Sequence, residues 1–190
     1  CRWIEEDYNR PYCALQPPMP LQVLDVGTGS GCIAVTLAAD LRNSAVTAWD
    51  ISGDALLIAR ENVHEWGVRV ELKMEDVLHP SASAMQQQFD VIVSNPPYIC
   101  EKERTAMAKN VLAYEPATAL FVPDDDPLRF YRAIAEYGLQ IFSEEGTLYF
   151  ETNPIYINKV EEMLSSLGYK QIEQREDQFG KLRFIKAIRP

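Results

Sequence analysis

Runs of apolar residues alternate with segments of helical periodicity along most of this chain. The apolar runs are short and rich in Val, Ile, Leu and Ala, which is typical of strands buried on both faces of a parallel sheet. Strands are predicted at residues 21–26, 45–49, 68–73, 89–94 and 146–151. Helices are predicted at residues 32–39, 54–66, 127–142 and 156–167. This alternation predicts an α/β fold with a mostly parallel sheet.

The end of the chain has a different pattern. Two further strands, 169–175 and 182–188, flank the turn sequence Asp177-Gln178-Phe179-Gly180, which predicts a C-terminal antiparallel hairpin and a seven-stranded sheet. At the other end, residues 1–20 have the pattern of a helix tail and a Pro-rich linker, and we expect residues 21–190 to form one domain. Because the chain starts in mid-helix pattern without Met, we expect it to be part of a longer protein.

Three local features sharpen these expectations. Asp126 precedes Pro127, a residue that suits the first helical position, so Asp126 is predicted to cap the helix that follows. Trp66 continues the apolar spacing of its helix and is expected to pack. Residues 99–127 have little periodicity, and because long loops in compact domains are usually functional, we expect them to form a wall of a substrate site.

A glycine-rich loop, Gly27-Thr28-Gly29-Ser30-Gly31, connects the first strand to the first helix of the domain. Glycine has no Cβ, so the backbone of such a loop can approach a nucleotide-like ligand closely. With Asp25 the pattern is D-x-G-x-G-x-G, and the third glycine comes one residue earlier than in a dinucleotide fingerprint. The spacing favours an S-adenosylmethionine loop, and a nicotinamide-dependent oxidoreductase is the disfavoured alternative.

Two acidic positions follow at the ends of the next strands. Asp50 ends the second strand about 20 residues past the glycines, where a carboxylate accepts hydrogen bonds from ribose hydroxyls. Asp76 follows the third strand, and it is expected to accept from an adenine amine while Val77 packs on the ring. For Asp76, an ordinary loop role is an equally good interpretation.

The tetrapeptide Asn95-Pro96-Pro97-Tyr98 directly follows the buried strand 89–94. The carboxyl ends of such strands face the ligand crevice of an α/β sheet. The two prolines fix φ near −65° and remove two backbone donors, so a rigid, acceptor-rich corner is expected. The Asn95 amide oxygen and the Tyr98 ring complete a pocket suited to a planar –NH2 group. A purely structural turn is the alternative.

Composition narrows the classes of function. The chain has 190 residues, 47% of them hydrophobic, and no apolar run reaches membrane-spanning length. The four cysteines have no C-x-x-C spacing, so no zinc site and no disulfide framework are expected. The net charge of −10 disfavours nonspecific attraction to nucleic-acid backbones. We therefore expect a cytoplasmic protein without a metal, a membrane partner or a nucleic-acid partner.

Three segments together carry a family resemblance. They are 25–34, with the glycine loop, 93–99, with Asn-Pro-Pro-Tyr, and 114–120, Tyr-Glu-Pro-Ala-Thr-Ala-Leu. The chain resembles the HemK/PrmC family of protein-(glutamine-N5) methyltransferases from about Leu21 to its end. There are two departures. The family's N-terminal helical domain and its Pro-Arg-Pro-Glu-Thr-Glu-like segment are not in this sequence, and Glu151 is followed by Thr152-Asn153-Pro154 where the family usually has Glu followed by a glycine-containing turn.

The resemblance implies a Rossmann-like class I fold, S-adenosylmethionine as cofactor, and methylation of the glutamine in the Gly-Gly-Gln motif of a class I peptide-chain release factor. It implies a substrate pocket formed by Asn95, Pro96, Pro97 and Tyr98, with Asn95 as the catalytic residue. It also implies cofactor contacts from Gly27, Thr28, Gly29, Ser30, Gly31, Asp50, Ile51, Asp76, Val77 and Asn95.

Two alternatives stay open. Asn-Pro-Pro-Tyr also occurs in N6-adenine methyltransferases, so a nucleobase amine on DNA or RNA is the second candidate substrate. The third reading is a non-enzymatic cofactor-binding module, which the intact motifs disfavour. The oligomeric state is left open.

Overall fold

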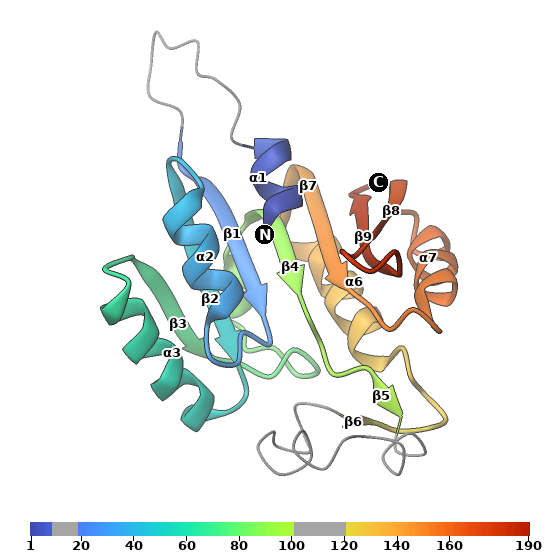
Figure 1. The fold of residues 1–190 in the computed structure, drawn as a ribbon, viewed down its shortest axis with the longest axis horizontal. Coiled ribbons are helices and arrows are strands. Elements are labelled where there is room, and N and C mark those ends of the chain that lie inside the picture. The colour runs from blue at the N-terminus through green and yellow to red at the C-terminus, as the bar shows by residue number, and fades with distance from the viewer. Residues whose placement is uncertain (9–18, 101–120) are drawn as a thin grey trace, which may run out of the picture.

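The computed structural model describes residues 1–8, 19–100 and 121–190. Its main sheet has seven strands in the order β3-β2-β1-β4-β7-β9-β8 (Figure 1). The strands are β1 Leu21–Val26, β2 Ser44–Asp50, β3 Val70–Met74, β4 Phe89–Ser94, β7 Phe142–Glu151, β8 Lys170–Glu176 and β9 Leu182–Ile188. Strands β1, β2, β3, β4 and β7 pair in parallel, whereas β9 is antiparallel to both β7 and β8. The predicted α/β fold with a C-terminal hairpin is confirmed.

Helices cover both faces of this sheet (Figure 1). They are α1 Arg2–Tyr8, α2 Cys32–Asp40, α3 Gly53–Glu65, the short 3-10 helix η1 Ala84–Gln86, α6 Arg129–Ile141 and α7 Ile157–Ser166. One core cluster joins the sheet to α6 and α7, and a second joins it to α1 and α2. Strand β1, which has a neighbour on each side, contributes to both clusters, with Leu24 in the first and Val23 in the second. This is why its sequence is apolar almost throughout.

Helix α1 packs on the sheet rather than standing away from it. Trp3 and Ile4 are buried, and the guanidinium of Arg175 in β8 lies 4.0 Å from the centre of the Trp3 ring. The same arginine pairs with Glu6 at 2.7 Å, and the Tyr149 hydroxyl in β7 donates to Asp7 at 2.6 Å. Residues 2–8 are therefore held by both apolar and charged contacts to β7 and β8.

Two local expectations are wrong. Helix α6 begins at Arg129, not Pro127, and its N-cap Leu128 makes no side-chain capping bond. The Asp126 carboxylate instead accepts two hydrogen bonds from Arg132, both at 3.0 Å, because a bidentate guanidinium is the stronger partner. Trp66 is 66% exposed, since it lies at the C-terminal end of α3 beyond the face that packs on the sheet.

Most of the predicted substrate wall, together with the Tyr114–Leu120 segment of the family motif, lies in residues 101–120, outside the described residues. The ends of that stretch are described. Strand β5 (Ile99–Cys100) pairs in parallel with β6 (Phe121–Val122) in a separate two-stranded sheet. Among residues 1–8, 19–100 and 121–190, no helix has the length and apolar character needed to cross a membrane.

Candidate active site

The sequence motifs meet at the carboxyl ends of adjacent strands. In register, Val26 at the end of β1 lies beside Trp49 of β2 on one side and Ser94 of β4 on the other. The Ser94 hydroxyl donates to the Val26 carbonyl at 2.6 Å and is fully buried there. The glycine loop and Asn95, which follow these strands directly, therefore leave the sheet side by side. This edge is where α/β sheets bind ligands.

All three loop glycines have a left-handed backbone, with φ of 71° at Gly27, 56° at Gly29 and 84° at Gly31. Other residues adopt this region only with strain. The space around them differs. No atom lies within 4 Å of a Cβ built on Gly27 or Gly29, whereas one built on Gly31 would meet the Ala59 Cβ at 3.1 Å. Gly31 thus allows the close approach of α2 and α3, and Gly27 and Gly29 face open space suited to a ligand.

Asp25 anchors the glycine loop through hydrogen bonds. It is fully buried, and its Oδ2 accepts from the Thr28 hydroxyl at 2.6 Å and from the Ala34 backbone N–H at 3.1 Å. Burial raises the pKa of its carboxyl to about 6, although the two hydrogen bonds oppose the shift. Oδ1 is buried without a partner among the described residues. The bonds from Thr28 and Ala34 make Asp25 an internal anchor of the glycine loop.

Asp50 connects the glycine loop to the next helix. Its Oδ2 accepts from the Gly29 backbone N–H and its Oδ1 from the Ser52 backbone N–H, both at 2.8 Å. A carboxylate has about four acceptor positions, so each oxygen can take one more donor. The neighbouring side chain, Ile51, is 63% exposed. The hydrogen bonds from Gly29 and Ser52 thus orient the Asp50 carboxylate, and the bond from Gly29 also holds the glycine loop in place.

Asp76 and Val77 lie just beyond β3. The Asp76 carboxylate accepts from the Leu78 backbone N–H at 2.9 Å and contacts Nδ1 of His79 at 3.0 Å. Burial opposes the shift, but these bonds lower the pKa of Asp76 below its ordinary value. Val77 packs against the core cluster that includes α6, and the backbone N–H of Glu75 donates to the Asp50 carbonyl at 3.0 Å. The segment that follows β3 is therefore hydrogen-bonded to the end of β2.

The Asn-Pro-Pro-Tyr segment leaves β4 with one exposed polar side chain. Asn95 is exposed and its side chain makes no hydrogen bond with the described part of the chain. Pro96 is buried, and Pro97 and Tyr98 are half-buried. Because the prolines fix the backbone on one side and β4 fixes it on the other, Asn95 presents free amide hydrogen-bonding groups from a rigid position.

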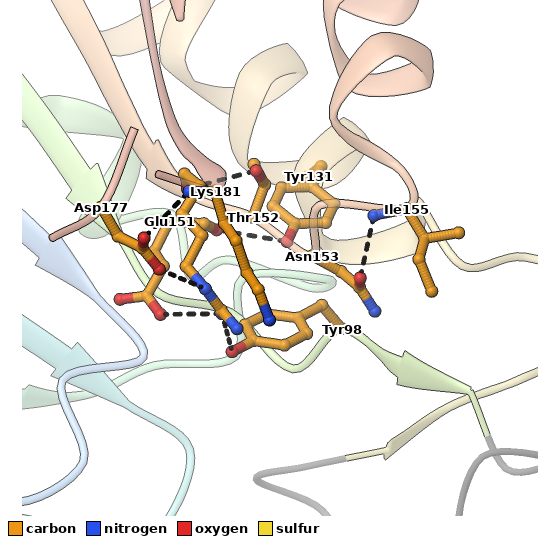
Figure 2. A network of polar contacts seen from close by, with 9 residues as sticks. Tyr98, Tyr131, Glu151, Thr152, Asn153, Ile155, Asp177 and Lys181 are labelled. Atoms are coloured by element: carbon orange, nitrogen blue, oxygen red, sulfur yellow. Dashed lines mark hydrogen bonds and ion pairs between the residues drawn. The ribbon is translucent and has the colours of Figure 1, made fainter. Parts of the chain in front are cut away.

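A polar network behind Tyr98 has no counterpart in the sequence motifs. Figure 2 shows Tyr98, Glu151 and Asp177 facing one another from three different parts of the chain. Arg183 of β9 joins them: its guanidinium lies 3.4 Å from the Tyr98 hydroxyl, 3.8 Å from the Glu151 carboxylate and 3.2 Å from the Asp177 carboxylate. Burial raises the pKa of Glu151 in spite of Arg183, and burial together with Glu151 raises the pKa of Tyr98. In the sequence Glu151 entered only as the residue before a turn that departs from the family, and nothing in the sequence pointed to Arg183.

Comparison with known proteins places this geometry in a family. Residues 14–121 match the family model described as the methyltransferase small domain. The chain belongs to this family. It is 47% identical, over 90% of its length, to a release factor glutamine methyltransferase of Bacteroides thetaiotaomicron, and covers 62% of that protein. It is 42% identical to another of Flavobacterium psychrophilum, covering 88% of this chain and 58% of that protein.

These relatives confirm the resemblance inferred from the motifs. The chain spans about three-fifths of the length of these two curated relatives. A methyltransferase from Pyrococcus furiosus, of known crystal structure, shares the fold with a TM-score of 0.68 at 18% identity, over 98% of this chain and 80% of its own. The class I methyltransferase fold is therefore established for this chain. In the described residues, no cluster of His, Cys, Asp and Glu suited to a metal ion is present.

Proposed function

We propose that this chain is the catalytic part of an S-adenosylmethionine-dependent methyltransferase that transfers a methyl group to N5 of the glutamine in the Gly-Gly-Gln motif of a class I peptide-chain release factor. The observation that carries the proposal is the exposed Asn95 side chain, which is held between β4 and two prolines beside the glycine loop and has no hydrogen-bond partner among the described residues. The names of the relatives support the protein substrate.

The residues at the ends of β1, β2 and β3 fit S-adenosylmethionine. Open space at Gly27 and Gly29 leaves room for the ligand against the backbone, with Thr28, Ser30 and Gly31 completing the loop. Asp50 retains acceptor capacity for ribose hydroxyls, and Ile51, Asp76 and Val77 would surround adenine. Bound S-adenosylmethionine supplies an electrophilic methyl group on a sulfonium.

The substrate side has to orient a poor nucleophile. The lone pair of an amide nitrogen is delocalised into its carbonyl, so holding the nitrogen in line and out of water is the main task. Asn95 Oδ1 and the Pro96 carbonyl would accept the two amide hydrogens, which favours a pyramidal nitrogen. Tyr98 would cover the amide plane. No general base is needed before transfer, because the methylated nitrogen is far more acidic than the free amide.

The test uses radiolabelled S-adenosylmethionine with purified class I release factor, a variant of that factor with Ala in place of the motif glutamine, and duplex DNA. Label is expected on the wild-type factor alone. Label on DNA would instead support the nucleobase-amine alternative, and equal label on the Gln→Ala factor would discard the glutamine target. Running the same assay with the full-length protein separates chemistry from docking, since labelling by the full-length protein alone assigns docking to regions beyond this chain.

A further inference from the structure

Tyr98 is held from a distance by the C-terminal hairpin. Its hydroxyl accepts from the Arg183 guanidinium at 3.4 Å across 85 residues of sequence. The Glu151 carboxylate acts on the same hydroxyl electrostatically and, after burial, is the largest cause of its raised pKa. The Arg183 guanidinium also pairs with the Glu151 carboxylate at 3.8 Å, so Arg183 bridges the hydroxyl and the carboxylate. The far end of the Tyr98 ring is therefore held by Arg183, which Glu151 holds in turn.

Arg183 is itself fixed at both of its ends. Its backbone carbonyl accepts from the Thr152 N–H at 2.7 Å and from the Thr152 hydroxyl at 3.2 Å, and Thr152 is fully buried. Its guanidinium pairs with Asp177 at 3.2 Å. Asp177 is in turn held by the hairpin turn, because its other oxygen accepts from the backbone N–H groups of Phe179 and Lys181 at 2.8 Å and 3.0 Å. Each side chain between the hairpin turn and Tyr98 is therefore held by a hydrogen bond or an ion pair.

We propose that Arg183 is a positioning residue for methyl transfer, setting the orientation of the Tyr98 ring and so the width of the pocket in which the substrate amide lies beside Asn95. This rests on the proposed function. The backbone of Tyr98 follows two prolines and is rigid, but the ring can still rotate about its side-chain bonds, and a covering ring that rotates leaves the amide several orientations. The clamp formed by Arg183 and Glu151 removes that freedom (Figure 2 shows Tyr98 and Glu151 within it).

The experiment compares Arg183→Met, Tyr98→Phe and the double variant with wild type, measuring kcat and KM for release factor and binding of S-adenosylhomocysteine. Tyr98→Phe keeps the ring and removes only the clamped hydroxyl, without touching the hairpin. Each single variant should lower kcat about tenfold, as expected for loss of a hydrogen bond to a charged group, with KM and cofactor binding within about twofold. The double variant should be no slower than either single variant, because both changes break the same link.

Arg175→Met is the matched control. Arg175 lies on the same hairpin and also makes an ion pair, with Glu6, but in register it faces Phe184, so it points to the opposite side of the sheet from Arg183. It should retain wild-type kcat. Multiplicative losses in the double variant, or an equal loss in Arg175→Met, would show that Arg183 only stabilises the hairpin and would overturn the inference. A wild-type protein that leaves release factor unlabelled would overturn the proposed function itself, whereas labelling by wild type with unchanged kcat in Arg183→Met would overturn the positioning role alone.

Discussion

The two halves of the candidate site are built in different ways. On the side of β1 and β2, the glycine loop and the Asp50 carboxylate are fixed by bonds between residues no more than 21 positions apart: Asp25 to Thr28, Asp50 to Ser52, and Asp50 to Gly29. On the side of β4, Tyr98 is fixed by Arg183 from the last strand of the sheet. The first half is encoded within a short stretch of sequence, and the second exists only when distant strands have assembled. Substitutions in the two halves should therefore fail differently.

The largest effect is expected in the second half. Asn95→Ala removes the proposed acceptor for the substrate amide and should lower kcat by about 100-fold or more if the bond acts mainly in the transition state. Binding of S-adenosylhomocysteine, measured by calorimetry, should change little. Asn158→Ala, an exposed asparagine in α7, is the matched control and should retain activity. Near-normal turnover in Asn95→Ala would remove Asn95 from the mechanism.

The buried carboxyl of the first half should make stability depend on pH. The pKa of Asp25 is about 6 in the fold, against about 3.9 in an unfolded chain, so the folded state holds this proton between those values. Its contribution to stability is complete below about pH 4 and is lost as the pH rises through 6. The loss is on the order of 3 kcal/mol.

Chemical denaturation at several pH values tests this. The free energy of unfolding of Asp25→Asn, relative to wild type, should rise across the interval from pH 4 to 7. Asp54→Asn, which changes an exposed carboxylate in the first turn of α3, should follow the wild-type curve. A constant difference between Asp25→Asn and wild type would show that this carboxyl does not titrate in the interval.

Cofactor affinity should respond to Asp50 and leave the substrate half intact. Asp50→Asn keeps one acceptor oxygen for the loop but loses the charge and half of the acceptor capacity. We expect binding of S-adenosylhomocysteine to weaken about tenfold, with kcat at saturating cofactor within about threefold of wild type. A fall in kcat comparable to that of Asn95→Ala would mean that the two halves are not separable.

The smallest effect distinguishes two glycines of one loop. Alanine at either position adopts a left-handed backbone with strain of about 1 kcal/mol. Gly31→Ala also brings a Cβ to 3.1 Å from the Ala59 Cβ, so it should be less stable than Gly29→Ala by up to about 1 kcal/mol in thermal or chemical unfolding. Gly29→Ala should instead show the larger loss of cofactor affinity, because its Cβ enters open space. The reverse order of affinity would contradict a ligand at Gly29.

The same contrast explains what the sequence could predict. The sheet, its hairpin and the positions of the glycine loop, Asp50 and Asn95 follow from apolar periodicity and from motifs a few residues long. The prediction that Asp126 caps α6 was wrong because a competing partner, Arg132, lies six residues away on the helix itself. The prediction that Trp66 packs was wrong because apolar periodicity does not show where a helix ends its contact with the sheet. The Arg183 clamp had no local signal, since an arginine in an edge hairpin is ordinary until tertiary structure brings it to Tyr98.

The strand order also has a consequence for synthesis. Strands β1 to β4 are contiguous in sequence and adjacent in the sheet, so a nascent chain can pair them and form the glycine loop early. Tyr98 is made at that stage as well, but its guanidinium partner follows 85 residues later, on a strand inserted between β7 and β8. A growing polypeptide would thus form its candidate cofactor site well before its candidate substrate pocket. The strand order determines this sequence of events, because Arg183 lies near the end of the chain.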